Sequence, residues 1–285
     1  MRKMRQIFWV AGVEFRKFLT AKNLILILFS FIFLGESVIA KLVAISAETG
    51  IKLNYLEPLN LILSKSFHAM IIPIAFIVLL SNFPDKSSGG IFMMVRMKRG
   101  TWIFGQIAYA MLVGIFYLCF ITVGSVIWIG KAGFFSTEWS AFMTTLYTDY
   151  PEVYATNSNY FIEAGTVTQG KPMEVFVISC IFMLFYLVTM AQILCLFKLI
   201  HWKRIGLFFD MVLTVFGAAA VSCLADVKWV FPLAHAIFGI HFRDFFAEPI
   251  LPLRHSVWYF LILNILLGLL NRSVIKKCQI GDDFE

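Results

Sequence analysis

Long apolar runs separated by short polar segments form the main pattern along this chain. Each run has roughly the length of about 20 residues that a helix needs to cross the hydrocarbon of a bilayer. The pattern predicts six transmembrane helices, at Leu24–Ala44, Phe67–Phe83, Trp102–Gly130, Glu174–Phe197, Ile205–Leu224 and Ser256–Val274. We therefore expect an all-α polytopic membrane protein that forms a single transmembrane domain over residues 1–285.

The positive charges between the spans predict the orientation of the chain, because cytoplasmic loops carry an excess of Lys and Arg. Four segments on one side hold 16 of the 24 Lys and Arg residues. The other side holds the remaining 8, together with 11 of the 17 acidic residues. We therefore predict that both termini are cytoplasmic and that the number of spans is even.

Composition agrees with this interpretation. The chain is 60% hydrophobic and 14% charged, with a mean hydropathy of +0.83. This apolar content exceeds what one soluble core could hide, so lipid is the expected solvent. The net charge of +7 lies mainly in the membrane flanks, so it calls for no nucleic acid partner. The five cysteines fall within spans or at cytoplasmic ends, where a disulfide framework is not expected.

Residues 1–23 carry the pattern of an amphipathic helix that lies in the membrane interface. One face of this predicted helix is apolar and the opposite face is basic. The apolar face comprises Phe8, Ala11, Phe15, Phe18 and Leu19, and the basic face comprises Lys3 and Lys17. A plain positively charged flank is the alternative.

Two long segments are predicted outside the membrane. Residues 131–172 are rich in aromatic side chains, including Trp139 and Tyr154, and are interpreted as a lid that contacts cargo or as a structural cap. Residues 226–254 interleave aromatic residues with His235 and His241, which favours a re-entrant or interfacial hairpin. The two histidines are spaced poorly for one helical metal site, so no metal is expected.

Several positions inside the predicted spans stand out. Glu36 needs an interfacial position, a partner or a wet cavity. It is a candidate for a substrate path, together with Trp139, Tyr154, His235 and His241 of the outer segments. Ala110 with Gly114, and Ala218 with Ser222, are small residues spaced four apart. Such pairs let helix backbones approach closely, either within this chain or against a second subunit.

A catalytic centre is not expected. The sequence contains no H-E-x-x-H, C-x-x-C or G-x-S-x-G motif. The run Gly124–Ala132 departs from a phosphate-binding loop, because five residues separate its glycines and Ala follows the lysine. Glu36, Gln192, Asp210 and Asn264 are interpreted as too scattered for an intramembrane enzyme. We predict no cofactor in this chain.

The stretch between the second and third predicted spans, residues 84–101, forms a compact cytoplasmic unit. A proline, a serine cap and two glycines precede a short predicted helix that is apolar in its first half and basic in its second. It is long enough to lie across the membrane surface, near anionic lipid headgroups, and to contact a cytosolic partner. The candidate contact residues are Asp85, Ser88, Gly89, Gly90, Met93, Met94, Arg96, Lys98 and Arg99.

This stretch resembles the cytoplasmic motif of the ABC-2 type permease family of ATP-binding cassette exporters. The resemblance rests on Asp85, Ser88, Gly89, Gly90, Arg96, Arg99, Trp102, Ile103, Gly105 and Gln106. The layout of the rest of the chain is also similar to that family over nearly the full length. The shared features are two cytoplasmic termini, an amphipathic first segment and an aromatic hairpin before the last span.

The resemblance implies the transmembrane half of an exporter in the plasma membrane. In that family two permease subunits pair, as a homodimer or heterodimer, and two copies of a separate cytosolic ATPase bind ATP and Mg. The stretch 84–101 would then hold the coupling helix that contacts the ATPase. A peptide or antimicrobial compound is the favoured cargo. The alternative is an accessory or immunity subunit that binds a peptide at the outer face without transporting it.

Overall fold

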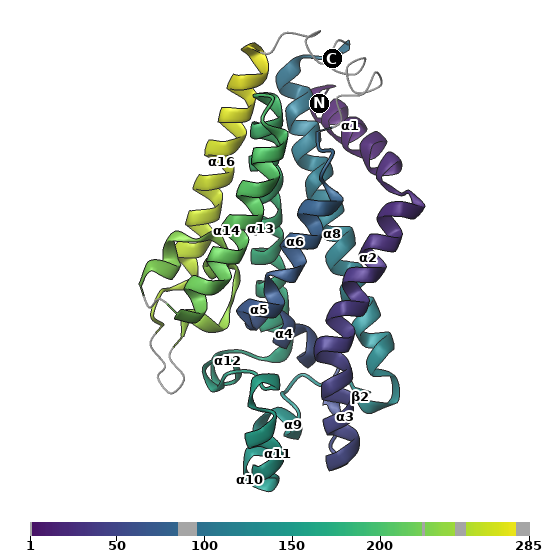
Figure 1. Cartoon of the computed structure of the whole chain (residues 1–285), viewed down its shortest axis with the longest axis vertical. Helices are drawn as coiled ribbons and strands as arrows, with labels where there is room; N and C mark the ends of the chain where they lie inside the picture. The colour runs from purple at the N-terminus through teal and green to yellow at the C-terminus, as the bar shows by residue number, and fades with distance from the viewer. Residues whose placement is uncertain (1, 85–95, 224–225, 243–248, 278–285) are drawn as a thin grey trace.

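The computed structural model describes residues 2–84, 96–223, 226–242 and 249–277. Long helices run side by side along the long axis of the molecule (Figure 1). They are α1 (Arg2–Phe18), α2 (Ala21–Leu34), α8 (Arg99–Ile129), α13 (Pro172–Leu199), α14 (Lys203–Cys223) and α16 (Leu253–Lys277). Among the described residues, five helical runs are long and apolar enough to cross a membrane, or up to six if one bent pair counts as a span. An all-α polytopic protein is therefore confirmed, whereas a count of six spans stays a prediction.

The first span is longer than predicted. Helix α2 continues through a π-helical turn (Gly35–Ile39) into α3 (Ala40–Thr49), which gives a run of 29 residues instead of Leu24–Ala44. Thr20 caps its start, because its side chain accepts a hydrogen bond from the Asn23 backbone N–H at 3.4 Å. Gly50 ends the run with a positive φ of 71°, which glycine adopts at little cost.

The second predicted span, Phe67–Phe83, is organised differently in the structure. Helix α4 (Glu57–Ser64) meets the pair α5 (Ser66–Ala69) and α6 (Ile71–Leu79) at a bend of 90°. The bend lies at Lys65, whose extended backbone (φ −90°, ψ 121°) interrupts the helix. Pro73 lies in the first turn of α6, where its missing N–H costs little.

Helix α13 lies at the centre of the described structure. It is 61% buried over its most apolar window, whereas no other long helix exceeds 39%. Helices α8, α14 and α16 pack around it. A tight basic turn joins α13 to α14, and His201 in this turn adopts the left-handed conformation with φ 64°.

The two ends of the molecule differ. The start of α1, the start of α8 and the end of α16 gather at one end, which we call the terminal end (Figure 1). The opposite end, which we call the cap end, holds short elements. They are β1 (Leu53–Asn54), β2 (Gly133–Phe134), α9 (Ala141–Thr144), α10 (Leu146–Asp149), α11 (Pro151–Thr156), α12 (Ala164–Gln169), α15 (Pro232–Ala236) and the 3-10 turns η2 (Gly130–Ala132), η3 (Ser158–Tyr160), η4 (Val227–Val230) and η5 (Gly239–His241). Strands β1 and β2 pair in parallel.

Helix α1 confirms that the first segment is helical. It packs along the first turns of α8, where Gly105 leaves room for Val10: a Cβ on Gly105 would lie 2.6 Å from the Val10 Cβ. The predicted apolar face is divided, because Ala11 and Phe18 are buried while Phe8 is 64% exposed. Its placement in a membrane interface stays a prediction.

Candidate functional site

A basic groove opens at the terminal end between α1, α8 and α16. Its volume is about 860 Å³. Its cationic lining residues are Lys3, Lys98, Arg99, Arg272 and Lys276, and its apolar lining includes Met4, Ile7 and Phe104. Within the described part of the chain, no acidic side chain lines it. The groove therefore suits a negatively charged group at the membrane surface.

The first turn of α8 is fastened to the last turn of α16. The Arg99 guanidinium donates through Nη1 to the carbonyls of Ile275 and Lys276, at 3.1 and 3.0 Å. A cation in this place satisfies carbonyls that have no partner within their own helix and complements the helix dipole. Arg272 lies across Gly100, where an added Cβ would be 3.3 Å from its Nε atom.

Residues 82–84, which follow α6, are also hydrogen-bonded to neighbouring helices. Lys198 Nζ, at the end of α13, donates to the carbonyls of Asn82 and Pro84, at 2.5 and 2.6 Å. Lys203 Nζ, at the start of α14, donates to Asn82 Oδ1 at 2.8 Å. The described residues on both sides of the segment 85–95 are thus hydrogen-bonded to other helices.

The predicted ATPase-contact residues fall into two groups. Asp85, Ser88, Gly89, Gly90, Met93 and Met94 lie outside the described residues. Arg96 and Lys98 are exposed, and Arg99 is half-buried in the contact with α16. The three predicted contact residues that the structure describes, Arg96, Lys98 and Arg99, therefore lie at the terminal end, at or next to the basic groove.

The predicted small residues lie at contacts within this chain. Gly114 of α8 faces α13, since a Cβ there would be 2.8 Å from the Leu184 Cδ1 atom. Ala110 and Ala218 are buried. Ser222 is exposed, and its hydroxyl is 2.9 Å from that of Ser66. A role in a contact between subunits stays a prediction.

Polar side chains meet between α13 and α16, inside the predicted spans. Gln192 Nε2 donates to Asn264 Oδ1 at 2.6 Å, and Asn264 Nδ2 donates to Thr189 Oγ1 at 3.0 Å. Two turns further along α16, Asn271 Nδ2 donates to the Gln192 carbonyl at 3.0 Å. Of the four residues predicted to be scattered, Gln192 and Asn264 therefore meet. Residues three or seven positions apart lie on the same face of a helix. This spacing holds for Thr189 and Gln192 in α13 and for Asn264 and Asn271 in α16, and the sequence analysis missed it.

Asp210 is an enclosed acid in α14. It is 0% exposed, and among the described residues neither carboxylate oxygen has a hydrogen-bond partner. One turn on, the Thr214 hydroxyl is 2.9 Å from the hydroxyl of Tyr186 on α13. Glu36, which the sequence singled out inside a span, is exposed in the π-helical turn. Of these two acids, Asp210 rather than Glu36 is therefore withdrawn from the surface.

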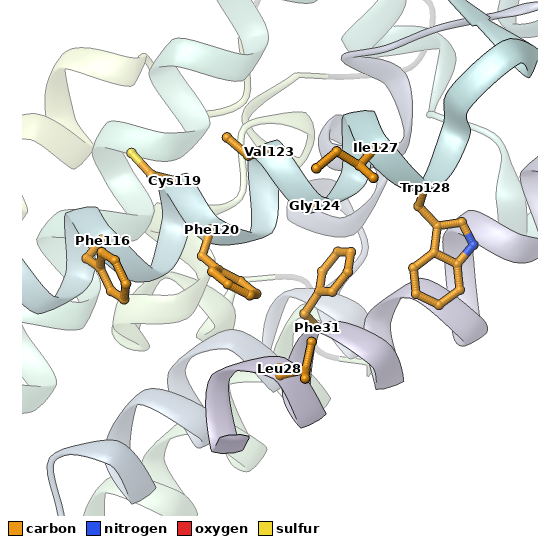
Figure 2. Close-up of a pocket in the computed structure, with 9 residues that line it drawn as sticks. All are labelled: Leu28, Phe31, Phe116, Cys119, Phe120, Val123, Gly124, Ile127 and Trp128. Carbon is orange, nitrogen blue, oxygen red and sulfur yellow. The ribbon is translucent and has the colours of Figure 1, made fainter. Parts of the chain in front are cut away.

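An apolar groove of about 480 Å³ lies between α2 and α8. Figure 2 shows Phe31 pointing from α2 toward Gly124 of α8, between Phe120 and Trp128. Gly124 makes this approach feasible, because a Cβ there would lie 2.7 Å from the Phe31 ring. The full lining is Leu28, Phe31, Phe116, Cys119, Phe120, Val123, Gly124, Ile127 and Trp128. Among the described residues, no Asp, Glu, His, Lys or Arg side chain lines this groove.

A buried carboxylate holds the cap end together. The Glu57 side chain accepts hydrogen bonds from the Asn54 N–H at 2.9 Å, the Ser140 N–H at 2.7 Å and the Ser140 hydroxyl at 2.8 Å. The Asn54 side chain continues the network by donating to the Ser136 and Glu138 carbonyls. The segment after α3 is thereby joined to the segment after β2, which supports a structural role for this part of the cap.

Trp139 and Tyr154, two predicted substrate-path residues, belong to the cap itself. Trp139 Nε1 donates to the Gly170 carbonyl at 2.8 Å. The Tyr154 ring packs on Phe161, with 4.8 Å between the ring centres. In the described structure, no hydrogen bond or ring contact joins Glu36, Trp139 or Tyr154 to His235 or His241. The predicted path residues therefore do not form one cluster.

His235 and His241 meet on a serine of α16. His235 Nδ1 and His241 Nε2 lie 2.8 and 2.7 Å from the Ser256 hydroxyl oxygen. The opposite ring nitrogens face backbone carbonyls, at 2.9 Å from Trp229 and 2.9 Å from Ile237 respectively. Burial lowers the pKa of His235, and burial, assisted by the nearby His235 and Lys228, lowers the pKa of His241 to about 4.

The described residues contain no group of three or more His, Cys, Asp or Glu side chains that could hold a metal ion. No protein-family model matches the chain, and neither the curated proteins nor the solved structures gave a match.

Proposed function

We propose that this chain is the permease subunit of an ATP-driven exporter of the ABC-2 type, powered by a separate cytosolic ATPase that docks at the terminal end. This assignment extends the resemblance carried by residues 85–106. A peptide or antimicrobial compound is the proposed cargo, and the plasma membrane is the proposed location. In this scheme the terminal end is cytoplasmic and the cap end lies outside.

One observation supports this proposal above the others. The segment 85–95 is flanked by residues that are hydrogen-bonded to three other helices: Pro84 and Asn82 to α13 and α14, and Arg99 to α16. In our proposal, a force applied at this place reaches α13, α14 and α16 through the hydrogen bonds of Asn82, Pro84 and Arg99. Rigid-body shifts between packed helices are a common means of transmitting such a force.

The polar contacts between α13 and α16 fit a transporter. Polar side chains in membrane spans face the bundle interior and mark paths for substrates or ions. Gln192 Oε1 and Asn271 Oδ1 are buried and have no hydrogen-bond partner within the described structure. These atoms can accept hydrogen bonds from water or from a polar cargo that reaches this interface.

The proposal is tested by co-expressing the chain with candidate ABC ATPases and measuring complex formation and ATP hydrolysis in lipid nanodiscs. Reversing an exposed charge at a docking surface costs affinity, so Arg96→Glu is expected to weaken ATPase binding by about tenfold. Lys131→Glu is the matched control, because Lys131 is exposed at the cap end. The Lys131→Glu variant is expected to bind the ATPase as tightly as the wild type does.

Two results would contradict the proposal. One is that no ATPase co-purifies with the chain and none is stimulated by it. The other is that Arg96→Glu and Lys131→Glu weaken the complex equally. If the chain instead binds a peptide at the cap end and recruits no ATPase, the accessory or immunity subunit is the correct function.

A further inference from the structure

We propose that His235, Ser256 and His241 form a binding site for a single proton, which the two imidazoles share through the serine hydroxyl. The cluster is enclosed, with exposures of 4%, 0% and 0% for these three residues. The inference does not depend on the exporter function, because it follows from hydrogen-bond geometry alone.

The backbone determines which ring nitrogens carry hydrogen. His235 Nε2 lies 2.9 Å from the Trp229 carbonyl, and His241 Nδ1 lies 2.9 Å from the Ile237 carbonyl. A carbonyl only accepts hydrogen bonds, so both of these nitrogens are donors. In a neutral imidazole the second nitrogen is then an acceptor.

Both acceptor nitrogens point at the same hydroxyl oxygen, at 2.8 and 2.7 Å. The Ser256 hydroxyl has one hydrogen and can donate it to only one ring. With two neutral rings, the other contact brings two lone pairs together with no hydrogen between them. The neutral cluster is therefore one proton short of a complete set of hydrogen bonds.

One proton from the medium completes the set. It binds the free nitrogen of one ring, which becomes an imidazolium and donates to the Ser256 oxygen, while the serine hydrogen bonds the other ring. Exchanging the roles of the two rings gives a second arrangement with the same bonds. A second proton would leave the serine hydrogen without an acceptor in the cluster and would place two cations beside one hydroxyl.

The surroundings set the pH range of uptake. Tyr259 stacks on His235 with 3.9 Å between ring centres, and Phe182 lies against His241. Lys228 is the nearby cation, 5.2 Å from the Trp229 ring centre. Glu163 approaches Gly239 but is paired with Lys65 at 3.2 Å. Burial lowers the pKa of both rings, and His235 and Lys228 lower that of His241 further, so we expect proton uptake below the ordinary histidine pKa of about 6.5.

The proton has a structural consequence. The two histidines belong to α15 and η5, whereas Ser256 belongs to the first turn of α16. At neutral pH one hydrogen bond joins residues 226–242 to α16 through the serine, and after proton uptake two bonds join them. Acidification therefore adds one hydrogen bond between these elements at the cap end.

The test is nitrogen-15 NMR of histidine-labelled full-length chain in lipid nanodiscs, titrated from about pH 7.5 to about pH 4. The chain has 5 histidines, so His235 and His241 are assigned by single substitutions at the others. The expected result is one common midpoint for both rings and a total uptake of one proton. Uptake of two protons with separate midpoints, or of none, would overturn the proposal.

Three variants sharpen the test. The variant His241→Gln places an amide NH₂, a neutral donor, beside the Ser256 oxygen. The serine hydrogen can then bond to His235 without an added proton, so the midpoint pH of His235 is expected to fall by about one unit. Ser256→Ala removes the shared hydroxyl and should abolish the common midpoint. Ser256→Thr keeps the hydroxyl and should preserve it. A common midpoint that survives in Ser256→Ala would contradict sharing through the serine.

Discussion

Two buried acids, Glu57 at the cap end and Asp210 in α14, have the same exposure and opposite surroundings. Both are 0% exposed. Glu57 accepts hydrogen bonds from two backbone N–H groups and one hydroxyl. Asp210 has no hydrogen-bond partner for either oxygen among the described residues. Burial alone therefore does not reveal what an enclosed carboxylate does.

The difference follows from the backbone around each acid. Asn54 ends β1, Glu57 begins α4 and Ser140 precedes α9, so the N–H groups of Asn54 and Ser140 lie at the ends of elements and can donate to the carboxylate. Around Asp210 the neighbouring backbone is helical, and its N–H groups are used within the helices. An ionised carboxylate without donors is costly in such a place, so Asp210 fits a protonated acid. Glu57 thus joins separate segments of the cap through hydrogen bonds, whereas Asp210 is a buried polar group that joins none of the described segments.

The largest expected effect is at Glu57. Glu57→Ala leaves three donors of Asn54 and Ser140 without an acceptor, which should destabilise the protein by about 3 kcal/mol or more. The measurement is thermal unfolding of the purified chain in detergent. Glu48→Ala is the control, because Glu48 is exposed, and a change within about 0.5 kcal/mol is expected. Equal losses in the two variants would refute the organising role.

An intermediate effect is expected between α13 and α16. Asn264→Ala leaves the Gln192 side chain without its hydrogen-bond partner and should cost about 1 kcal/mol, a usual value for polar contacts between membrane helices. Replacing both residues with Leu removes donor and acceptor together. The double variant should therefore recover part of the loss in a double-mutant cycle. Strict additivity of the two substitutions would show that the contact carries no coupling.

The smallest effect is expected at Asp210. An amide has nearly the shape of a protonated carboxyl group, so Asp210→Asn should change stability by less than about 1 kcal/mol. Glu57→Gln is the matched comparison and should cost more, because the new amide NH₂ would face donors at Asn54 or Ser140. Thermal unfolding of both variants measures the contrast. A stabilisation of several kcal/mol by Asp210→Asn would mean that Asp210 is ionised in the wild type.

Some features of the candidate site were readable from residue types. The basic composition of residues 96–99 predicted a cationic surface, and Lys98 and Arg99 do line the groove. The cations that complete it, Lys3, Arg272 and Lys276, come from the two ends of the chain. Their convergence depends on how α1 and α16 pack on α8, which no local pattern encodes. The pairing of His235 and His241 through Ser256 was missed for the same reason.

The sequence by itself determined the long helices, because an apolar run of sufficient length must satisfy its backbone hydrogen bonds internally in lipid. It also determined the helical character of the first segment. Only the tertiary structure decided the bend at Lys65, the central place of α13 and the meeting of Gln192 with Asn264. These features depend on which faces of separate helices meet, and contacts between residues far apart in sequence settle that choice.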